Sequence, residues 1–361
     1  MAEQEQSVRE IRLNPIVPSE SVLIATARGM RPKKEEERAP RDTRERVETC
    51  PFCRGNEAKT PPAIATYPES GEWDIRIVEN LYPVLGDDRG DNNMFSFGLQ
   101  QAIDGYGRHE VIIDNSSHGI AVHDMTEEHL TMLLSAYRRR MQELYVSDER
   151  LRYVLVFKNF GPAAGASIPH THSQIIAMPV TPQNVLDEVV NSKQFYDKHH
   201  HCIFCSLIDE ALTYEATIYD KQSGEVRRKI NVGQYVVERG EKFIAIKPFA
   251  SRYEWEVHIL PLQHQADYIN ASEEDLADFA RVLKRTMQRL DAVLGGAQYN
   301  YFLHSLPHDP EQEGCEHSYH WHLEICPRTS IPTGFELGSG LFVNTVNPEE
   351  AAAELRNVSL D

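Results

Sequence analysis

The sequence predicts an α+β fold made of two tandem halves, each an antiparallel sheet with helices packed against it. Two observations carry this prediction. Landmark residues of the first half recur in the same order in the second half, and in each half short apolar segments surround one long amphipathic segment, a mixture of patterns that is typical of α+β units. The 361 residues suffice for two such units, which we place at residues 1–190 and 191–361.

The repeat is defined by three pairs of landmarks. The offset is 152 residues for a C-x-x-C pair, 146 for a histidine that precedes a helix start, and 150 for a His-x-His motif. An ordered set at nearly constant offset indicates a duplicated unit. The pairs are Cys50-Pro-Phe-Cys53 with Cys202-Ile-Phe-Cys205, His118 with His264, and His170-x-His172-x-Gln174 with His320-x-His322-x-Glu324.

One long helix is predicted in each half. Thr126 and Ser272 are the predicted N-caps, because large apolar residues follow each of them at helical spacing. Gly295 and Gly296 end the second helix. Residues 31–49 are predicted to form an exposed loop, and 213–234 an insertion. The predicted strands are apolar segments around these helices: 111–113, 151–157 and 167–178, then 243–246, 257–260, 299–303 and 320–325.

Composition limits the partners. Lys and Arg number 37 against 55 Asp and Glu, a net charge of −18 that repels nucleic acid and anionic membranes. The sequence has no run of about 18 apolar residues and no N-terminal signal-peptide pattern, so we expect a cytoplasmic protein. In a reducing compartment C-x-x-C pairs favour metal or redox use over disulfides, which leaves Cys315 and Cys326 as plain thiols.

Each C-x-x-C pair combines with two histidines of the repeat into a Cys2His2 set. Such ligands favour zinc, and four protein ligands leave no open position, so two structural zinc sites are predicted. The alternative for a single pair is incidental core thiols or a redox couple. His199, His200 and His201 are rival ligands beside Cys202. The predicted sets are Cys50, Cys53, His118 and His170, and Cys202, Cys205, His264 and His320.

The chemistry is predicted around the His-x-His motif of the first half. Residues two apart in a strand share a face, so one histidine can hold zinc while His172 faces a ligand. The alternative is that His172 is a second metal ligand or a core histidine. The preceding small-residue loop favours the first hypothesis, because Lys158, Asn159, the Ser167 hydroxyl and backbone N–H groups can approach a phosphate there.

His172 is the predicted nucleophile. Neutral imidazole is competent near neutral pH, and a histidine bonded to phosphorus stays reactive enough to pass the group on. Gln174 can donate its amide hydrogens to a phosphoryl oxygen that gains negative charge in the transition state. The repeat counterpart Glu324 is anionic and repels phosphate. This difference, and the lack of a small-residue loop before His320, assign the chemistry to the first half.

Motifs along nearly the whole chain resemble those of the galactose-1-phosphate uridylyltransferases, members of the histidine-triad superfamily. The resemblance implies two histidine-triad-like halves and a ping-pong reaction. A nucleoside diphosphate sugar leaves its nucleotidyl group on His172, and a sugar 1-phosphate or phosphate removes it. The motifs are Ala27-Arg28-Gly-Met-Arg31-Pro32, Cys50-Pro-Phe-Cys53, Asn80-Leu-Tyr-Pro83, Gly165-Ala-Ser167, His170 to Gln174, and Thr333-Gly-Phe335-Glu336.

The resemblance also implies roles for single residues, and a homodimer in which Arg28 and the segment at Phe335 reach the partner's site. Ser167, Gly165 and Gln174 hold the phosphate; Arg31, Asn80 and Asn159 lie near the nucleotide; Phe335 and Glu336 contact the sugar.

Two departures from the family pattern concern the motif and the substrate. Thr171 stands where proline is usual between the histidines, and residues 338–344 look more like the branch that acts as ADP-glucose phosphorylase. We expect a UDP-glucose:hexose-1-phosphate uridylyltransferase, with ADP-glucose phosphorylase as the alternative. A rival of another class is a non-enzymatic zinc-binding interaction protein, in which Gln174 has no role.

Overall fold

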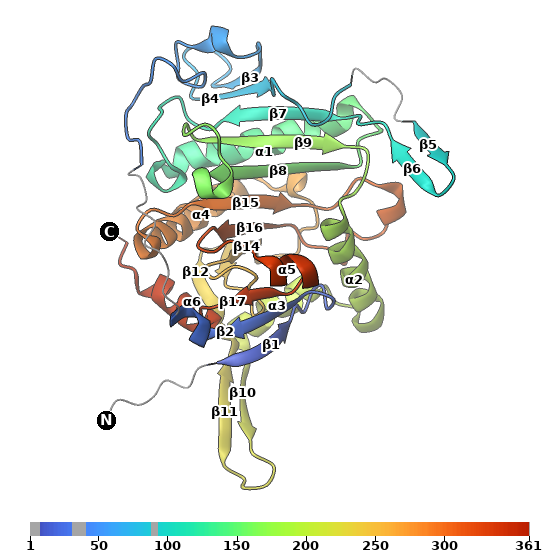
Figure 1. The fold of residues 1–361 in the computed structure, drawn as a ribbon, viewed down its shortest axis with the longest axis vertical. Helices are drawn as coiled ribbons and strands as arrows, with labels where there is room; N and C mark the ends of the chain where they lie inside the picture. Colours follow the sequence, from blue (N-terminus) through green and yellow to red (C-terminus); the bar gives the residue numbers. More distant parts are fainter. Residues whose placement is uncertain (1–7, 31–40, 88–92, 361) are drawn as a thin grey trace.

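The computed structural model describes residues 8–30, 41–87 and 93–360. Its centre is a ten-stranded sheet in which all neighbouring strands are antiparallel (Figure 1). In spatial order the strands are β12 (Val236–Arg239), β13 (Phe243–Ile246), β14 (Val257–Pro261), β16 (His322–Pro327), β15 (Tyr299–His304), β8 (Tyr153–Phe160), β9 (His172–Met178), β7 (Arg108–Ile113), β4 (Ile75–Glu79) and β3 (Ala63–Tyr67).

The two halves of this sheet are related by a pseudo-twofold axis. Phe157 of β8 lies opposite Gln174 of β9, and Phe302 of β15 lies opposite Glu324 of β16. Phe157 and Phe302 are therefore repeat equivalents, and they also lie opposite each other where β8 pairs with β15. The predicted α+β fold of two similar antiparallel halves is confirmed, and the register assigns an equivalent to each sheet residue.

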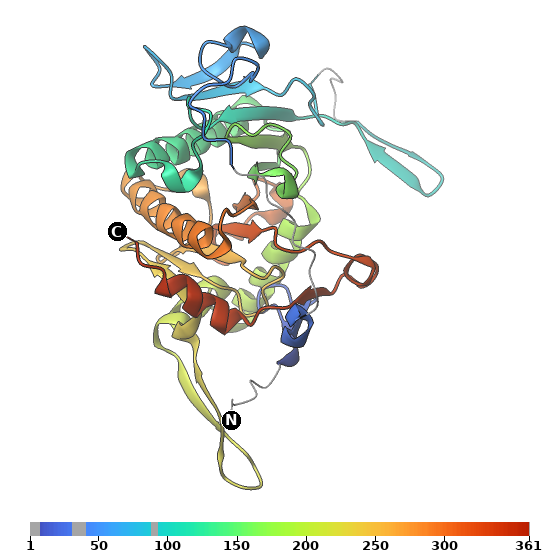
Figure 2. The same cartoon turned by 60° about the vertical axis from the view of Figure 1, so that its left-hand side comes forward.

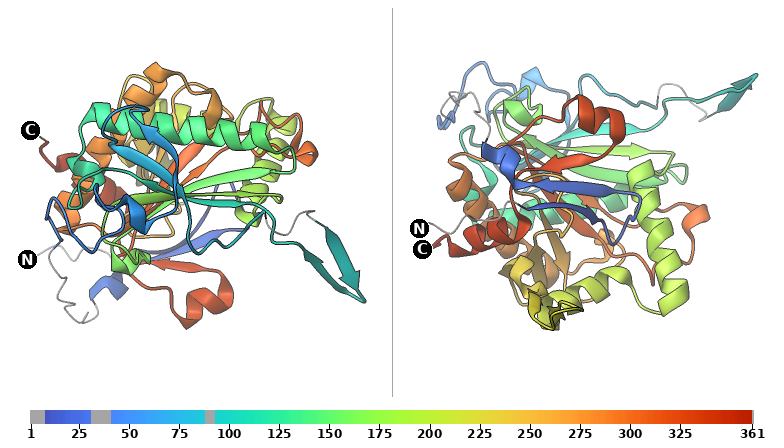
Figure 3. Two further views of the ribbon diagram at one scale, coloured as in Figure 1. Left: turned by 90° about the horizontal axis from the view of Figure 1, so that it is seen from above. Right: turned by 60° about the horizontal axis from the view of Figure 1, so that its bottom comes forward.

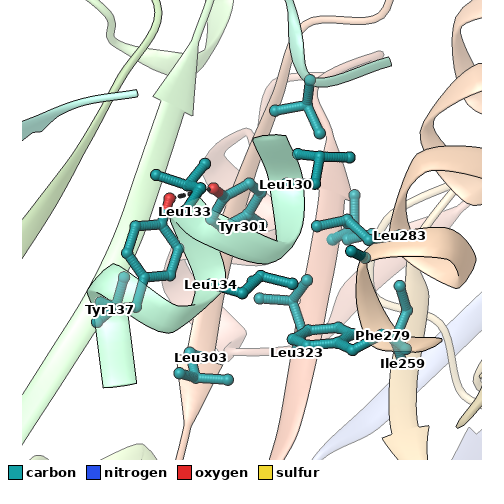
Figure 4. Close-up of a cluster of buried hydrophobic side chains, with 14 of the residues drawn as sticks. Leu130, Leu133, Leu134, Tyr137, Ile259, Phe279, Leu283, Tyr301, Leu303 and Leu323 are labelled. Atoms are coloured by element: carbon teal, nitrogen blue, oxygen red, sulfur yellow. Dashed lines mark hydrogen bonds between the residues drawn. The ribbon is translucent and has the colours of Figure 1, made fainter. Parts of the chain in front are cut away.

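Two long helices cover one face of the sheet. They are α1 (Glu127–Ser147) and α4 (Glu273–Leu294), which pack together in Figure 2. Both predicted N-caps are confirmed, since Thr126 and Ser272 accept hydrogen bonds from N–H groups of the first turn. Gly295 caps α4 in the left-handed conformation, with φ of 60°. Figure 4 shows apolar side chains of both helices meeting those of β15 and β16 in the main core.

The opposite face carries smaller elements. These are α2 (Gln183–His199), α3 (Ile203–Thr213), α5 (Gly334–Ser339) and a three-stranded sheet of β1 (Arg9–Leu13), β2 (Ser21–Ala25) and β17 (Phe342–Asn344); Figure 3 shows α1 and α5 on opposite sides of the main sheet. The short helix η1 (Thr26–Met30) follows β2, and α6 (Pro348–Asn357) ends the chain beside α4. None of the helices within the described ranges combines the length and apolar composition of a membrane span.

Three predicted segments are corrected or completed by the structure. The strand predicted at 167–178 begins only at His172, because Pro169 has no N–H for a ladder and the chain before it turns through glycines with positive φ. The insertion at 213–234 contains a hairpin of β10 (Glu215–Tyr219) and β11 (Val226–Asn231), which projects from the rest of the molecule in Figure 2. A second projecting hairpin consists of β5 (Met94–Phe97) and β6 (Gln100–Ile103). The sequence did not indicate this second hairpin. The predicted loop at 31–49 is described from residue 41, without helix or strand.

Candidate active site

The first predicted metal set is assembled from three segments. Cys50 and Cys53 lie in a turn before β3, His118 follows β7, and His170 lies two residues before His172, which opens β9. All four ligand atoms lie within 4.8 Å of one another. The Sγ of Cys53 lies 3.5 Å from Nδ1 of both His118 and His170. This buried set of two sulfurs and two nitrogens is able to hold a metal ion.

Other groups aim the two rings at the cysteines. Nε2 of His170 donates to the carbonyl of Asn115 at 2.7 Å, and Nε2 of His118 lies 3.3 Å from the Asp42 carboxylate. Such outer contacts fix the orientation of a ligating imidazole. The segment before Cys50 therefore closes over this set.

The second set repeats the arrangement. The ligand atoms of Cys202, Cys205, His264 and His320 also lie within 4.8 Å of one another. Sγ of Cys205 lies 3.4 Å from Nδ1 of His264 and 3.5 Å from Nδ1 of His320. Here both Nε2 atoms donate to backbone carbonyls, that of His264 to Glu316 and that of His320 to Pro261, whereas in the first set only His170 does so.

The remaining cysteines and the rival histidines lie outside both sets. All six cysteines are free thiols, and Cys315 and Cys326 join no metal-binding group of the described residues. His200 is the left-handed C-cap of α2. The run His199 to His201 is exposed and is not part of the second set.

His172 presents one ring nitrogen for chemistry. Its Nδ1–H donates to the carbonyl oxygen of His170 at 2.8 Å, so in the neutral ring the lone pair is on Nε2. The side chain is buried, and the Phe52 ring packs edge-on at 5.1 Å between centroids. Burial holds the pKa of His172 below its ordinary value, which keeps the imidazole neutral and nucleophilic near pH 7.

Gln174 is oriented by His109, which no sequence motif indicates. The N–H of Val84 donates to Nδ1 of His109, so Nε2 of His109 carries the proton and donates to Oε1 of Gln174 at 2.8 Å. The amide nitrogen of Gln174 is thereby left to donate elsewhere. Asn80 lies beside them, with its side-chain nitrogen 3.0 Å from Nε2 of His109.

Asn159 is positioned from the second half of the chain. It shares a sheet face with Phe157 and hence with Gln174. The side-chain NH2 of Asn300 in β15 donates to Oδ1 of Asn159 at 2.7 Å and to the carbonyl of Ala164 at 2.9 Å. The NH2 of Asn159 is therefore turned away from Asn300, and the small-residue loop is tied to β15.

The small-residue loop offers fewer backbone donors than predicted. The N–H groups of residues 163–166 donate to the Gln298 side chain and to carbonyls of Gly161 and Pro162, because residues 162–164 form a short 3-10 turn. Gly165 follows in the left-handed conformation, with φ of 85°. Within the described chain the exposed Ser167 hydroxyl hydrogen-bonds to no protein group, so it remains a donor for a ligand.

The equivalent place in the second half is filled with charge. Arg252 pairs with Glu256 and Glu324, and His258 lies 3.0 Å from Glu256. Glu188, His304, His322 and Glu324 form a further buried group, which the sequence does not predict. A cavity of about 430 Å³, lined mainly by apolar side chains, lies beside Glu324 rather than beside His172. Glu256 and Glu324 line this cavity together with Arg252, which pairs with both carboxylates.

The remaining predicted residues lie elsewhere. Arg28 is in η1, while Phe335 and Glu336 are in α5, where Phe335 is exposed. Burial raises the pKa of Glu336, but hydrogen bonds from the Thr333 hydroxyl and from backbone N–H groups, together with the weaker influence of Arg28, hold it below its ordinary value. Arg31 lies outside the described residues. The structure therefore gathers His172, Gln174, Asn80 and Asn159 but records no contact of Arg28 or α5 with them among the described residues.

Comparisons with known proteins show the family to which this chain belongs. Residues 1–182 match the family model described as galactose-1-phosphate uridyl transferase, N-terminal domain. The ADP-glucose phosphorylase of Arabidopsis thaliana is 30% identical over 353 residues, covering 97% of this chain and 93% of its own length. A galactose-1-phosphate uridylyltransferase of Thermotoga maritima is 28% identical over 358 residues, covering 98% and 99%.

A solved structure matches over the same length. The crystal structure of an ADP-glucose phosphorylase from Arabidopsis thaliana with bound ADP-glucose superposes with a TM-score of 0.79 and 28% identity, covering 98% of this chain and 100% of its own. Its likeness includes both halves of the sheet. The chain therefore belongs to the galactose-1-phosphate uridylyltransferase family of nucleotidyltransferases.

Proposed function

We propose that this chain transfers a nucleotidyl group through a covalent intermediate on His172. Nε2 attacks the α-phosphorus of a nucleoside diphosphate sugar, a P–N bond forms, and the P–O bond to the departing sugar 1-phosphate breaks. An acceptor phosphate oxygen then attacks the same phosphorus and releases the histidine. The hydrogen bond from Nδ1 of His172 to the His170 carbonyl carries the proposal, because it leaves Nε2 unprotonated, and His172 is not a member of the neighbouring metal set.

The neighbouring side chains stabilise the transferred group. The amide nitrogen of Gln174 and the hydroxyl of Ser167 donate to phosphoryl oxygens as negative charge grows on them. The NH2 of Asn159 is available to the adjoining phosphate, since Asn300 occupies only its carbonyl oxygen. Gly165 keeps the loop close to the ligand because it has no side chain, and Asn80 lies at the nucleotide end. Catalysis here consists mainly of positioning and charge stabilisation.

The substrates we assign first are UDP-glucose and a hexose 1-phosphate, as in a galactose-1-phosphate uridylyltransferase. A second assignment is ADP-glucose with inorganic phosphate as acceptor. Two observations favour it: the segment 338–344 after Phe335 and Glu336, and the 30% identity to an ADP-glucose phosphorylase. Both assignments use the same intermediate and differ in the base and in the acceptor.

Zinc in both Cys2His2 sets belongs to the proposal. The four ligands of each set match the thiolate and imidazole chemistry of structural zinc, and the two sets occupy equivalent places of the repeat. Bound zinc would hold the segments before β9 and β16 in place, and no reaction step passes through it. A cytoplasmic location fits six unpaired cysteines.

A homodimer completes the proposed site. Arg28 in η1 and Phe335 and Glu336 in α5 are assigned to the partner's substrate, since no contact between them and His172 is recorded among the described residues. Phe335 is 54% exposed, and it is free to contact a sugar held by another protomer.

The test is to incubate the zinc-loaded protein separately with UDP-glucose and with ADP-glucose and to measure its intact mass. We expect a uridylyl adduct with the first or an adenylyl adduct with the second, removed again by galactose 1-phosphate or by phosphate respectively. The adduct identifies the base, and the compound that removes it identifies the acceptor. Absence of an adduct with both would favour the non-enzymatic zinc-binding protein.

A further inference from the structure

A buried polar network lies directly behind His172, on the opposite face of β9. The ammonium group of Lys158 pairs with the Asp114 carboxylate and donates to Oγ1 of Thr171 at 2.7 Å and to the backbone carbonyl of His172 at 3.0 Å. Ser173 donates to the same carboxylate at 3.0 Å. The side chains of Lys158 and Asp114 are fully buried.

This network extends into α1 and into the second half. The hydroxyl of Tyr137 in α1 lies 2.6 Å from the Ser173 hydroxyl and 2.8 Å from the hydroxyl of Tyr301 in β15. Figure 4 shows Tyr137 and Tyr301 joined at their hydroxyl groups, beside apolar side chains of α1, α4 and the strands. The backbone of the His172 strand is therefore held from two elements behind it.

The equivalent positions behind His322, in the half to which no chemistry is assigned, contain different residues. The register of the strands and the offset of the helix N-caps assign an equivalent in that half to Lys158, Asp114, Thr171, Ser173 and Tyr137, the members of the network that belong to the first half. All these equivalents are apolar, and they belong to or adjoin the main core. Lys158 corresponds to Leu303, Asp114 to Pro261, Thr171 to Trp321, Ser173 to Leu323 and Tyr137 to Leu283.

A contribution to folding stability alone does not explain why the first half has a buried polar network behind His172. Removing two charges from water costs several kcal/mol, and apolar replacements of buried ion pairs are often neutral or stabilising. Oδ1 of Asp114 has no hydrogen-bond partner among the described residues, so part of that cost is not offset. The same fold accommodates an apolar core at the equivalent place, which indicates that the polar network is kept for the site it adjoins.

We propose that Lys158, together with Asp114 and Thr171, is a positioning residue for His172. The ammonium group fixes the carbonyl of His172 and the side chain of the residue before it, and so sets the backbone from which the nucleophilic ring projects. The ring direction is fixed at a second point by its bond to the His170 carbonyl. This inference rests on the proposed function of His172, and it concerns the rate of attack rather than substrate binding.

The experiment measures single-turnover formation of the nucleotidyl adduct as a function of nucleotide sugar concentration, using whichever of UDP-glucose or ADP-glucose labels the wild-type protein. Thr171→Val removes one hydroxyl at constant shape, and Thr171→Ser restores it. The double variant Lys158→Met/Asp114→Asn removes both charges together, so no unpaired charge remains. Leu303→Met is the matched control, because Leu303 is the equivalent of Lys158 in the other half.

We expect Thr171→Val to lower the maximal rate about tenfold and the double variant about a hundredfold, since small misplacements of a reacting group cost this much. The concentration giving half the maximal rate should change less than about twofold, and Thr171→Ser and Leu303→Met should react like wild type. A wild-type maximal rate in Thr171→Val would overturn the inference. A variant in which only the concentration giving half the maximal rate rises, with the maximal rate unchanged, would also overturn it. Thr171→Val decides alone if the double variant does not fold. A wild-type protein that forms no adduct would instead overturn the proposed function.

Discussion

Nε2 of His109 donates to Oε1 of Gln174 at 2.8 Å, and this bond decides which end of the Gln174 amide faces the ligand. His109 lies in β7 and Gln174 in the neighbouring β9. The amide nitrogen is the only donor of this side chain. A glutamine held in this way presents hydrogens to a phosphate without first having to rotate.

Loss of the His109 hydrogen bond should therefore slow nucleotidyl transfer. We expect His109→Phe to lower the rate of adduct formation about tenfold, because a lost hydrogen bond to this amide is worth about 1 kcal/mol and the amide becomes free to flip. His109→Gln keeps a donor near the position of Nε2 and should retain most of the rate. Single-turnover mass measurements check both variants, and equal rates in both would contradict this role.

Asn300 should affect the site although it belongs to the other half. Asn300→Leu removes the donor that holds Asn159 and the carbonyl of Ala164, and leucine is the residue at the equivalent position, Leu155. We expect a roughly tenfold lower rate of adduct formation. The loop should also become more accessible to amide hydrogen exchange. Unchanged exchange at residues 161–166 would show that the loop does not depend on Asn300.

One cysteine substitution in each Cys2His2 set should show the contribution of that set separately. Cys50→Ser and Cys205→Ser should each halve the zinc content measured by elemental analysis, and each should lower the melting temperature. Only Cys50→Ser should also slow adduct formation, because His170 supplies both a ligand atom and the carbonyl that orients His172. A native preparation that lacks zinc and keeps full stability would contradict the assignment.

The buried pair of His304 and Glu188 predicts a pH-dependent stability. Nδ1 of His304 lies 3.0 Å from the carboxylate. Burial alone would lower the pKa of His304, but Glu188 raises it above its ordinary value. A raised folded pKa gives a contribution that is complete below the unfolded pKa of about 6.5 and is lost as the pH rises through the folded pKa.

Glu188→Gln should therefore destabilise the protein most at mildly acidic pH. We expect the free energy of unfolding in urea to fall by about 2 kcal/mol at pH 6 and by less at pH 9. Glu354→Gln, at an exposed position of α6, is the control and should show no such trend. A difference between wild type and Glu188→Gln that is constant with pH would exclude an ionised pair.

Much of the architecture follows from local patterns. Thr126 and Ser272 predict their helices because capping depends on neighbours in sequence. The two metal sets were predicted because a duplicated chain displays the same ligands twice. The start of β9 was predicted too early, because the apolar run that begins at Ser167 contains Pro169 and belongs to a turn.

Other parts depend on pairing between distant segments. His109 and Asn300 carry no motif, and their roles appear only when β7 meets β9 and β15 meets β8. Lys158 was predicted to face phosphate, yet its side chain points to the opposite face of the sheet and is fully buried. The sequence could have indicated this, because successive side chains of a strand point to opposite faces of the sheet, so Lys158 and Asn159 cannot face the same ligand.

The measurement that tests the central claim most directly is the intact mass of two matched variants after incubation with the nucleotide sugar that labels the wild type. In His172→Asn and His322→Asn the amide nitrogen replaces Nδ1, which donates to a backbone carbonyl in both halves, and Nε2 is removed. We predict no adduct on His172→Asn and a full adduct on His322→Asn. An adduct that persists without the His172 imidazole would contradict the account.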